Sequence, residues 1–238
     1  MQIIKFSPAQ RQALNDILRK FQSYSSFTRN KKFAYQYAEI FKIRTCPYCN
    51  INYIDTILNV TRPEFDHFEP KSSSEGKGKE LDIDNLIPSC HVCNSTIKRN
   101  KKFKIETHIH PFHDDFDSII NIFIDIKEAS YLIEDSFDIL FEGISPSKDN
   151  IKKAFQSIED LKLYARYRVH KSYVIEIMKF IKHYNDCHRK QIYDVLGVKH
   201  PEMATLETII YGYINTDINK TSLGKLRKDI LKSCVEKI

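Results

Sequence analysis

Glycine is scarce in this chain, with six in 238 residues, and no glycine-rich phosphate loop is present. The chain is therefore not expected to bind ATP itself. There is also no run of 18 or more apolar residues, so no membrane span is expected. The first residues, Met1 to Phe6, become polar too early for a secretory signal peptide. These absences predict a cytoplasmic protein that does not bind ATP.

Positive charge is unevenly distributed. The net charge of +6 is compatible with a polyanionic partner but does not establish one. Five basic residues lie within seven positions: Lys98, Arg99, Lys101, Lys102 and Lys104. A basic run is usually a solvated face, but this one directly follows a cysteine pair. Its position favours contact with the phosphates of a nucleic acid.

Four of the six cysteines form two CxxC pairs, Cys46–Cys49 and Cys90–Cys93. In a cytosolic chain this pattern favours metal over disulfides. Two intervening residues let both sulfurs reach one ion from a tight turn, and zinc prefers four tetrahedral thiolates. With all four positions filled, the zinc is expected to be structural. Cys187 and Cys234 stand alone in helical sequence and are expected to pack between helices.

Polar residues suited to hydrolysis lie between and just after the cysteine pairs. Phosphodiester hydrolysis needs a nucleophilic water, a base for its proton and a cation for the developing charge. A neutral imidazole, His67, suits the base. The oxygens of Asp66 and Asn94 suit magnesium. Asn85 could bond to the backbone beside His67 and fix its ring. A lone His beside an Asp is usually structural, and the zinc frame favours the catalytic interpretation.

This order of residues resembles the HNH endonuclease family, which has a ββα-metal fold. The family pattern is CxxC, Asp-His-x-x-Pro, Asn-Leu, and CxxC-Asn with a nearby Lys. Its counterparts here are Cys46–Cys49, Asp66–Pro70, Asn85–Leu86, Cys90–Asn94 and Lys98. The resemblance covers about a quarter of the chain.

The resemblance implies a role for each residue. His67 would be the general base, and Asp66 and Asn94 would hold one Mg²⁺ or Mn²⁺. Asn85 would orient His67 or the scissile phosphate. Water would attack phosphorus and leave 5′-phosphate and 3′-hydroxyl ends. Two details depart from the commonest pattern: the third signature residue is Asn94 rather than His, and three residues rather than two separate it from Lys98.

A finer resemblance points to a biological setting. Asp66–Ser72, His110–Phe112 and the long helical tail resemble the PtuB-like HNH components of bacterial Septu-type defence systems. Those proteins work with an ABC-type ATPase (PtuA-like), sometimes beside a retron reverse transcriptase and its msDNA. The resemblance implies an antiphage nuclease effector acting on DNA or tRNA. The terminal helices would then be docking surfaces, although helices that merely complete the core explain the same pattern.

Hydrophobic periodicity predicts the remaining architecture. A helix is expected at 7–21, where Ser7 and Gln10 form a capping box. A polar break at 22–32 precedes helical spacing in 33–41. Alternation over 118–142 predicts two strands.

From Asp149 onward helical periodicity returns, and residues 71–79 are expected to form a mobile loop. The predicted fold is α+β, a small ββα-metal module with a zinc knot surrounded by helices. Its expected segments are an N-terminal helical segment, an HNH core, short strands with a linker, and a C-terminal helical region: 1–45, 46–113, 114–148 and 149–238.

Two alternatives remain open. A zinc-stapled nucleic-acid-binding module would use the basic run and need none of Asp66, His67 or Asn94. A complex-assembly subunit would use only its helices. A second metal site at His108, His110 and His113 is conceivable, but the cysteine site already accounts for zinc. Substrate class, nicking or double-strand cutting, and oligomeric state are not readable from these residues.

Overall fold

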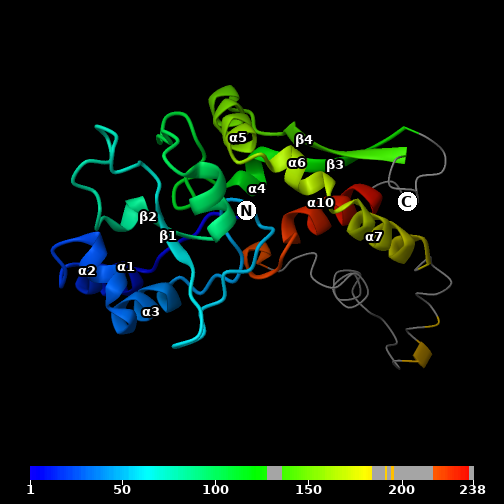
Figure 1. Ribbon diagram of the computed structural model, residues 1–238. Helices are drawn as coiled ribbons and strands as arrows, with labels where there is room; N and C mark the ends of the chain where they lie inside the picture. Colours follow the sequence, from blue (N-terminus) through cyan, green and yellow to red (C-terminus); the bar gives the residue numbers. More distant parts are fainter. Residues whose placement is uncertain (128–135, 184–190, 192–193, 196–216, 236–238) are drawn as a thin grey trace. The chain divides into compact units, whose positions relative to one another are not determined.

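The computed structural model describes residues 1–127, 136–183, 191, 194–195 and 217–235. They form helices and two small two-stranded sheets, as the predicted α+β class requires (Figure 1). The described residues cluster into two compact units. The first takes in 1–120, 143–163 and 218–223, and the second takes in 121–142, 164–217 and 224–238. The chain therefore does not divide at single points along the sequence.

The first helix of unit 1, α1, spans Pro8–Leu18. Ser7 caps it, and Gln10 completes the predicted capping box by accepting from the Ser7 backbone. Leu14, Ile17 and Leu18 form its buried stripe. The helix begins where the sequence predicted and ends three residues earlier.

A second helix, α2 (Tyr24–Arg29), lies in the stretch that the sequence indicated as a polar break. Ser23 caps it, and the α2 side chain Phe27 is fully buried. The Phe27 ring contacts Tyr37 of the next helix, α3 (Lys31–Ile40), at 5.3 Å between centroids. One buried aromatic residue and one cap thus hold a helix whose polar composition hides it from periodicity.

The strands β1 (Glu64–His67) and β2 (Leu86–Ser89) pair antiparallel, with Glu64 opposite Ser89. A short 3₁₀ helix, η1 (Ile83–Asn85), leads into β2. The helix η2 (Val92–Lys98) follows β2 and is a π-helix.

Glu64 and Asp66 both hydrogen-bond to residues of η2, so they share one face of β1. His67 lies next along the strand and faces the other way.

Residues 71–79 form turns and contain no helix or strand. Ser73 Oγ donates to Pro70 O and accepts from Gly76 N. A Cβ on Gly76 would lie 2.2 Å from Pro70 O, so only glycine fits there. Lys79 forms an ion pair with Glu69 at the far end of the segment. The segment predicted as a mobile loop therefore has a defined turn structure.

Unit 1 also contains α4 (Phe116–Ile119), α5 (Lys148–Asp160) and the 3₁₀ helix η4 (Ile218–Lys220). Backbone N–H groups of Arg44 and Thr45 both donate to Asn219 O, so η4 is attached to the chain just before the first cysteine pair.

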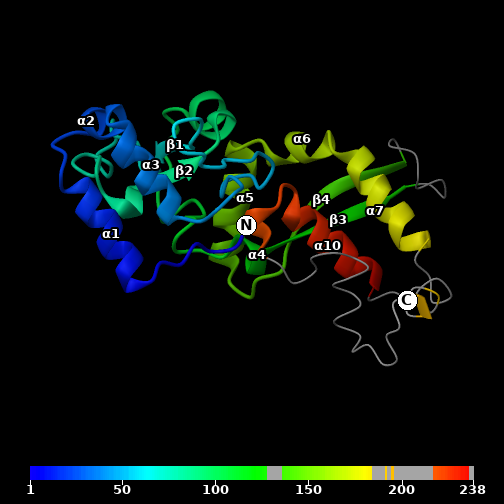
Figure 2. The ribbon, with the colours of Figure 1, turned by 90° about the horizontal axis from the view of Figure 1, so that it is seen from below.

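Unit 2 contains α7 (Lys171–His183), α10 (Gly224–Val235) and, apart from one terminal residue of each, β3 (Ile120–Ile126), β4 (Phe137–Gly143) and α6 (Leu163–Arg168). In both views α7 and α10 lie beside one another (Figures 1 and 2). The predicted strand alternation is confirmed by the burial of four side chains: Ile120, Ile122, Phe137 and Ile139.

The helical periodicity predicted from Asp149 onward falls partly on described residues. Leu226 and Ile230 of α10 are fully buried. Residues 206–213 of that predicted helical region and Cys187 lie outside the described residues, as does the side chain of Cys234. Within the described part of the chain, every helix is too short or too polar to cross a membrane.

Candidate metal centre and active site

The four CxxC cysteines meet at one point. All are buried, and their sulfurs lie within 4.8 Å of one another. In a tetrahedral zinc site with Zn–S near 2.3 Å, sulfurs are about 3.8 Å apart, so small adjustments close the shell. Backbone N–H groups of Ile51, Cys90 and Cys93 each donate to a cysteine sulfur at 3.4 Å. Such donors stabilise thiolates, so this residue set fits a structural zinc ion.

The two cysteine turns have matching geometry. Asn50 N donates to Cys46 O at 2.8 Å, and Asn94 N donates to Cys90 O at 3.0 Å. Asn50 has a φ of 52°, in the left-handed region that asparagine tolerates. Its amide also donates to Ile218 O at 2.7 Å. The first turn is thereby fixed to η4, whereas the second leads directly into η2.

Asp66 is sealed inside the module, at 3% exposure. Tyr48 Oη donates to its carboxylate at 2.6 Å, and Lys98 Nζ lies 3.0 and 3.1 Å from its two oxygens. Lys98 is itself 1% exposed and also donates to His67 O at 2.7 Å. Burial raises the pKa of Asp66 against the effect of Lys98 and Tyr48, and burial lowers the pKa of Lys98.

The π-helix explains how Lys98 reaches Asp66. Arg99 N donates to Asn94 O, five residues back, at 2.9 Å. A π-turn accommodates one more residue than an α-turn, so the extra residue between Asn94 and Lys98 is absorbed.

The placement of Lys98 corrects one expectation about the basic run. The sequence placed Lys98 among the phosphate contacts, but its ammonium is enclosed by Asp66 and the β1 backbone. Arg99 and Lys102 are exposed. Lys101 is partly covered and forms an ion pair with Asp160.

His67 lies under the segment that follows β1. Its side chain is largely covered, at 9% exposure, and its ring meets the Tyr24 ring edge-on at 4.6 Å. His67 Nε2 is 3.1 Å from Glu80 O. A proton assigned to Nε2 for that contact leaves Nδ1 as an acceptor. Burial lowers the pKa of His67 to about 4, so the imidazole is neutral at neutral pH.

Asn85 bonds to the backbone near His67. Its Oδ1 accepts from Glu69 N at 2.7 Å, and its Nδ2 donates to Glu69 O and Lys79 O at 3.2 Å. The sequence predicted that Asn85 would contact the backbone beside His67. In the structure Asn85 contacts the backbone of Glu69, two residues farther along the chain. Asn85 therefore fixes both ends of the segment that covers His67.

Asn94 pairs with a carboxylate that the sequence analysis missed. Its Nδ2 donates to Glu64 Oε2 at 2.8 Å, and Ser95 Oγ donates to the same oxygen at 2.7 Å. His91 Nδ1 lies 2.7 Å from Glu64 Oε1. Burial acts to raise the pKa of Glu64, but hydrogen bonds from Ser95, His91 and Asn94 hold it below its usual value. The available signal was the spacing of Glu64 two residues before Asp66, which puts both on one strand face.

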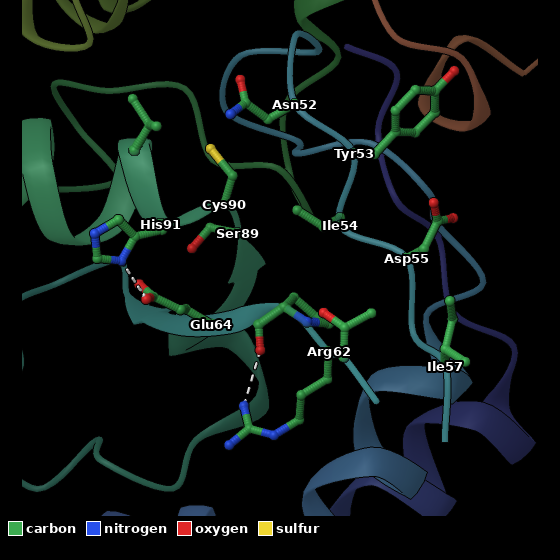
Figure 3. A pocket seen from close by; sticks show the side chains of 13 residues that line it. Asn52, Tyr53, Ile54, Asp55, Ile57, Arg62, Glu64, Ser89, Cys90 and His91 are labelled. Atoms are coloured by element: carbon green, nitrogen blue, oxygen red, sulfur yellow. Dashed lines mark hydrogen bonds and ion pairs between the residues drawn. The ribbon is translucent and has the colours of Figure 1, made fainter. Parts of the chain in front are cut away.

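A pocket of about 490 Å³ opens beside this cluster (Figure 3). Glu64, Ser89 and His91 line one side, and residues 52–55 and Ile57 line the other.

The expected magnesium pair can be tested against this geometry. Asp66 does not fit as a cation ligand, because the Lys98 ammonium already lies against its carboxylate and the group is buried. Asn94 does fit, because it is only partly covered and neighbours a carboxylate.

Two of the three histidines predicted as possible ligands of a second metal, His108 and His110, have structural partners. The His108 ring stacks on Phe103 at 3.9 Å, and its Nε2 lies 3.0 Å from Asp160 Oδ2. His110 Nε2 lies 2.8 Å from Asp84 O. Across the ranges that the structure describes, the four cysteines are the one group of three or more His, Cys, Asp or Glu side chains that lie close enough together to hold a metal ion.

Comparison with known proteins agrees with the motif. The family model described as HNH endonuclease matches residues 46–100, which include both cysteine pairs and everything between them. No curated protein and no solved structure matches the chain. The family match supports nuclease activity in general.

Proposed function

We propose that this protein is a metal-dependent endonuclease that hydrolyses phosphodiester bonds in DNA or tRNA. The observation that carries the proposal is the assembly of two distant cysteine pairs around β1, β2 and η2, within the segment that matches the HNH family. In this proposal β1, β2 and η2 form the ββα-metal module, and the cysteines hold structural Zn²⁺.

The proposed chemistry begins with His67. Its neutral imidazole accepts a proton from the attacking water, and Asn85 holds the backbone on either side of the covering segment. A bound Mg²⁺ or Mn²⁺ would stabilise negative charge on the phosphate. The products would carry 5′-phosphate and 3′-hydroxyl ends. Because His67 is covered, substrate contact requires the segment around Glu80 to move aside.

The exposed side chains of Arg99 and Lys102 are proposed to contact the nucleic-acid backbone, with Lys101 at the margin. Such contacts position a substrate without selecting its sequence.

We also propose a cytoplasmic antiphage role with an ABC-type ATPase partner. Its support is the resemblance of Asp66–Ser72 and His110–Phe112 to Septu-type components. Purification of the chain with its bound proteins would test it, and recovery of no ATPase would count against it.

A non-catalytic nucleic-acid-binding module is the second candidate. The buried ion pair between Lys98 and Asp66 favours this candidate, because Asp66, an expected metal ligand, is already paired inside the core. It predicts salt-sensitive binding without cleavage.

A cleavage assay separates the two candidates. Zinc-loaded wild type and His67→Ala would face plasmid DNA and total tRNA, with Mg²⁺ or Mn²⁺, and with EDTA. His113→Ala is the matched control, because that imidazole is exposed. We expect cleavage by wild type and His113→Ala, its loss in EDTA, and at least a hundredfold decrease in His67→Ala. Equal cleavage by His67→Ala with an intact fold would contradict the proposed mechanism.

A further inference from the structure

Glu64 gathers three side chains that can each offer a metal-ligand atom. His91 approaches one carboxylate oxygen, and Asn94 and Ser95 approach the other, all at 2.7–2.8 Å. Without an ion these groups donate to the carboxylate. A change of tautomer in His91 and an amide flip in Asn94 would turn a nitrogen lone pair and an oxygen toward a cation instead.

Ser89 provides an independent observation. It lies directly opposite Glu64 in the β1–β2 register and is fully buried. Its hydroxyl has no hydrogen-bond partner among the residues that the structure describes. In Figure 3 this hydroxyl points to the side of the pocket where Glu64 and His91 lie. A buried hydroxyl without a hydrogen-bond partner is energetically costly, so a ligand atom on this side of the pocket would stabilise it.

Of the two carboxylates on this face of β1, Glu64 rather than Asp66 is available to a cation. Asp66 and Glu64 share a strand face, but Asp66 already contacts a buried ammonium and a phenol. Glu64 contacts only neutral or titratable donors, and its side chain is 36% exposed. A cation can therefore approach Glu64 without displacing a charged partner.

We propose that Glu64, His91 and Asn94, with the Ser89 hydroxyl beside them, form a divalent-cation site. Carboxylate, amide and hydroxyl oxygens with one imidazole suit Mn²⁺. The site borders the 490 Å³ pocket, which leaves room for a substrate phosphate. The role of the ion in cleavage rests on the proposed nuclease function, whereas its binding does not.

Mn²⁺ binding to the zinc-loaded protein tests the site directly. Free Mn²⁺ would be followed by electron paramagnetic resonance during titration of wild type, Glu64→Gln and His91→Ala. Glu142→Gln is the matched control, since Glu142 is an exposed strand carboxylate outside the cluster. We expect one Mn²⁺ per wild-type chain beyond zinc, and at least a tenfold rise in Kd for the two cluster variants. The control should bind like wild type, and zinc content and melting temperature should stay unchanged in all variants.

Two results would overturn the site: no Mn²⁺ bound by wild type, or equal affinity in Glu64→Gln. Failure of the site and failure of the nuclease proposal are distinguishable. Mn²⁺ binding that depends on Glu64, without cleavage, supports the site and contradicts the nuclease. Metal-dependent cleavage with Mn²⁺ affinity unaffected in Glu64→Gln does the reverse.

Discussion

The two ends of strand β1 carry similar carboxylates in opposite environments. Asp66 is buried against Lys98 and Tyr48, and burial raises its pKa. Glu64, two residues earlier on the same face, is partly open to solvent, and hydrogen bonds hold its pKa below the usual value. A buried ammonium turns one acid into part of the core. Neutral donors and solvent leave the other acid available to an ion.

Removing the zinc knot should remove the difference between the Glu64 and Asp66 environments altogether, because the knot holds both ends of β1 against η2. In Cys90→Ser one thiolate is lost, and zinc binding energy of about 10–16 kcal/mol is also folding energy. We expect loss of zinc and of the cooperative thermal transition of unit 1, measured by metal analysis and calorimetry. Normal zinc content and melting temperature would contradict the four-cysteine site.

Removing only the Lys98–Asp66 ion pair should have the next largest effect on stability. Lys98→Met leaves the Asp66 carboxylate buried without its cation, which should lower the free energy of unfolding by about 3–5 kcal/mol. The exposed neighbour Arg99 provides a control, and Arg99→Met should change the free energy of unfolding by less than about 0.5 kcal/mol. Urea unfolding measures both.

A double variant, Lys98→Met with Asp66→Asn, sharpens this test. It should recover part of the lost stability, since no buried charge then remains. Equal unfolding free energies for Lys98→Met and Arg99→Met would show that the ion pair is not structural.

Two buried tyrosines give the smallest expected effects. Tyr48→Phe removes a hydrogen bond to the charged Asp66 and should lower the unfolding free energy by about 1.5–3 kcal/mol. Tyr37 is fully buried, and its hydroxyl has no partner within the described ranges. Tyr37→Phe should therefore be neutral or slightly stabilising. A larger loss in Tyr37→Phe than in Tyr48→Phe would contradict the assigned Asp66 contacts.

Local signals in the sequence predicted the elements that local chemistry determines. The Ser7–Gln10 capping box, the alternation in β3 and β4, and the meeting of the four cysteines could all be predicted from spacing alone. The π-turn in η2 could not, because seven residues span fewer than two turns, which is too short for apolar spacing to distinguish a π-helix from an α-helix. The burial of Lys98 follows from that turn. Helix α2 was missed because one tertiary contact set, around Phe27, stabilises an otherwise polar segment.

The sequence singled out residues for the candidate site but did not predict how they pair. Sequence pattern singled out Asp66, His67, Asn85 and Asn94, yet which carboxylate Asn94 meets depends on how η2 crosses β1. That crossing brings Asn94 to Glu64 and Lys98 to Asp66. Both contacts join residues about thirty positions apart, beyond the range of any local rule.

The most direct test of the central claim is cleavage of plasmid DNA and total tRNA by zinc-loaded wild type beside His67→Ala, in Mn²⁺. We expect wild type to cut at least one substrate and EDTA to stop it. His67→Ala should cut at least a hundredfold more slowly while keeping its zinc and its bound Mn²⁺. Cleavage by His67→Ala at the wild-type rate, or binding of both substrates with no cleavage by wild type, would contradict the account.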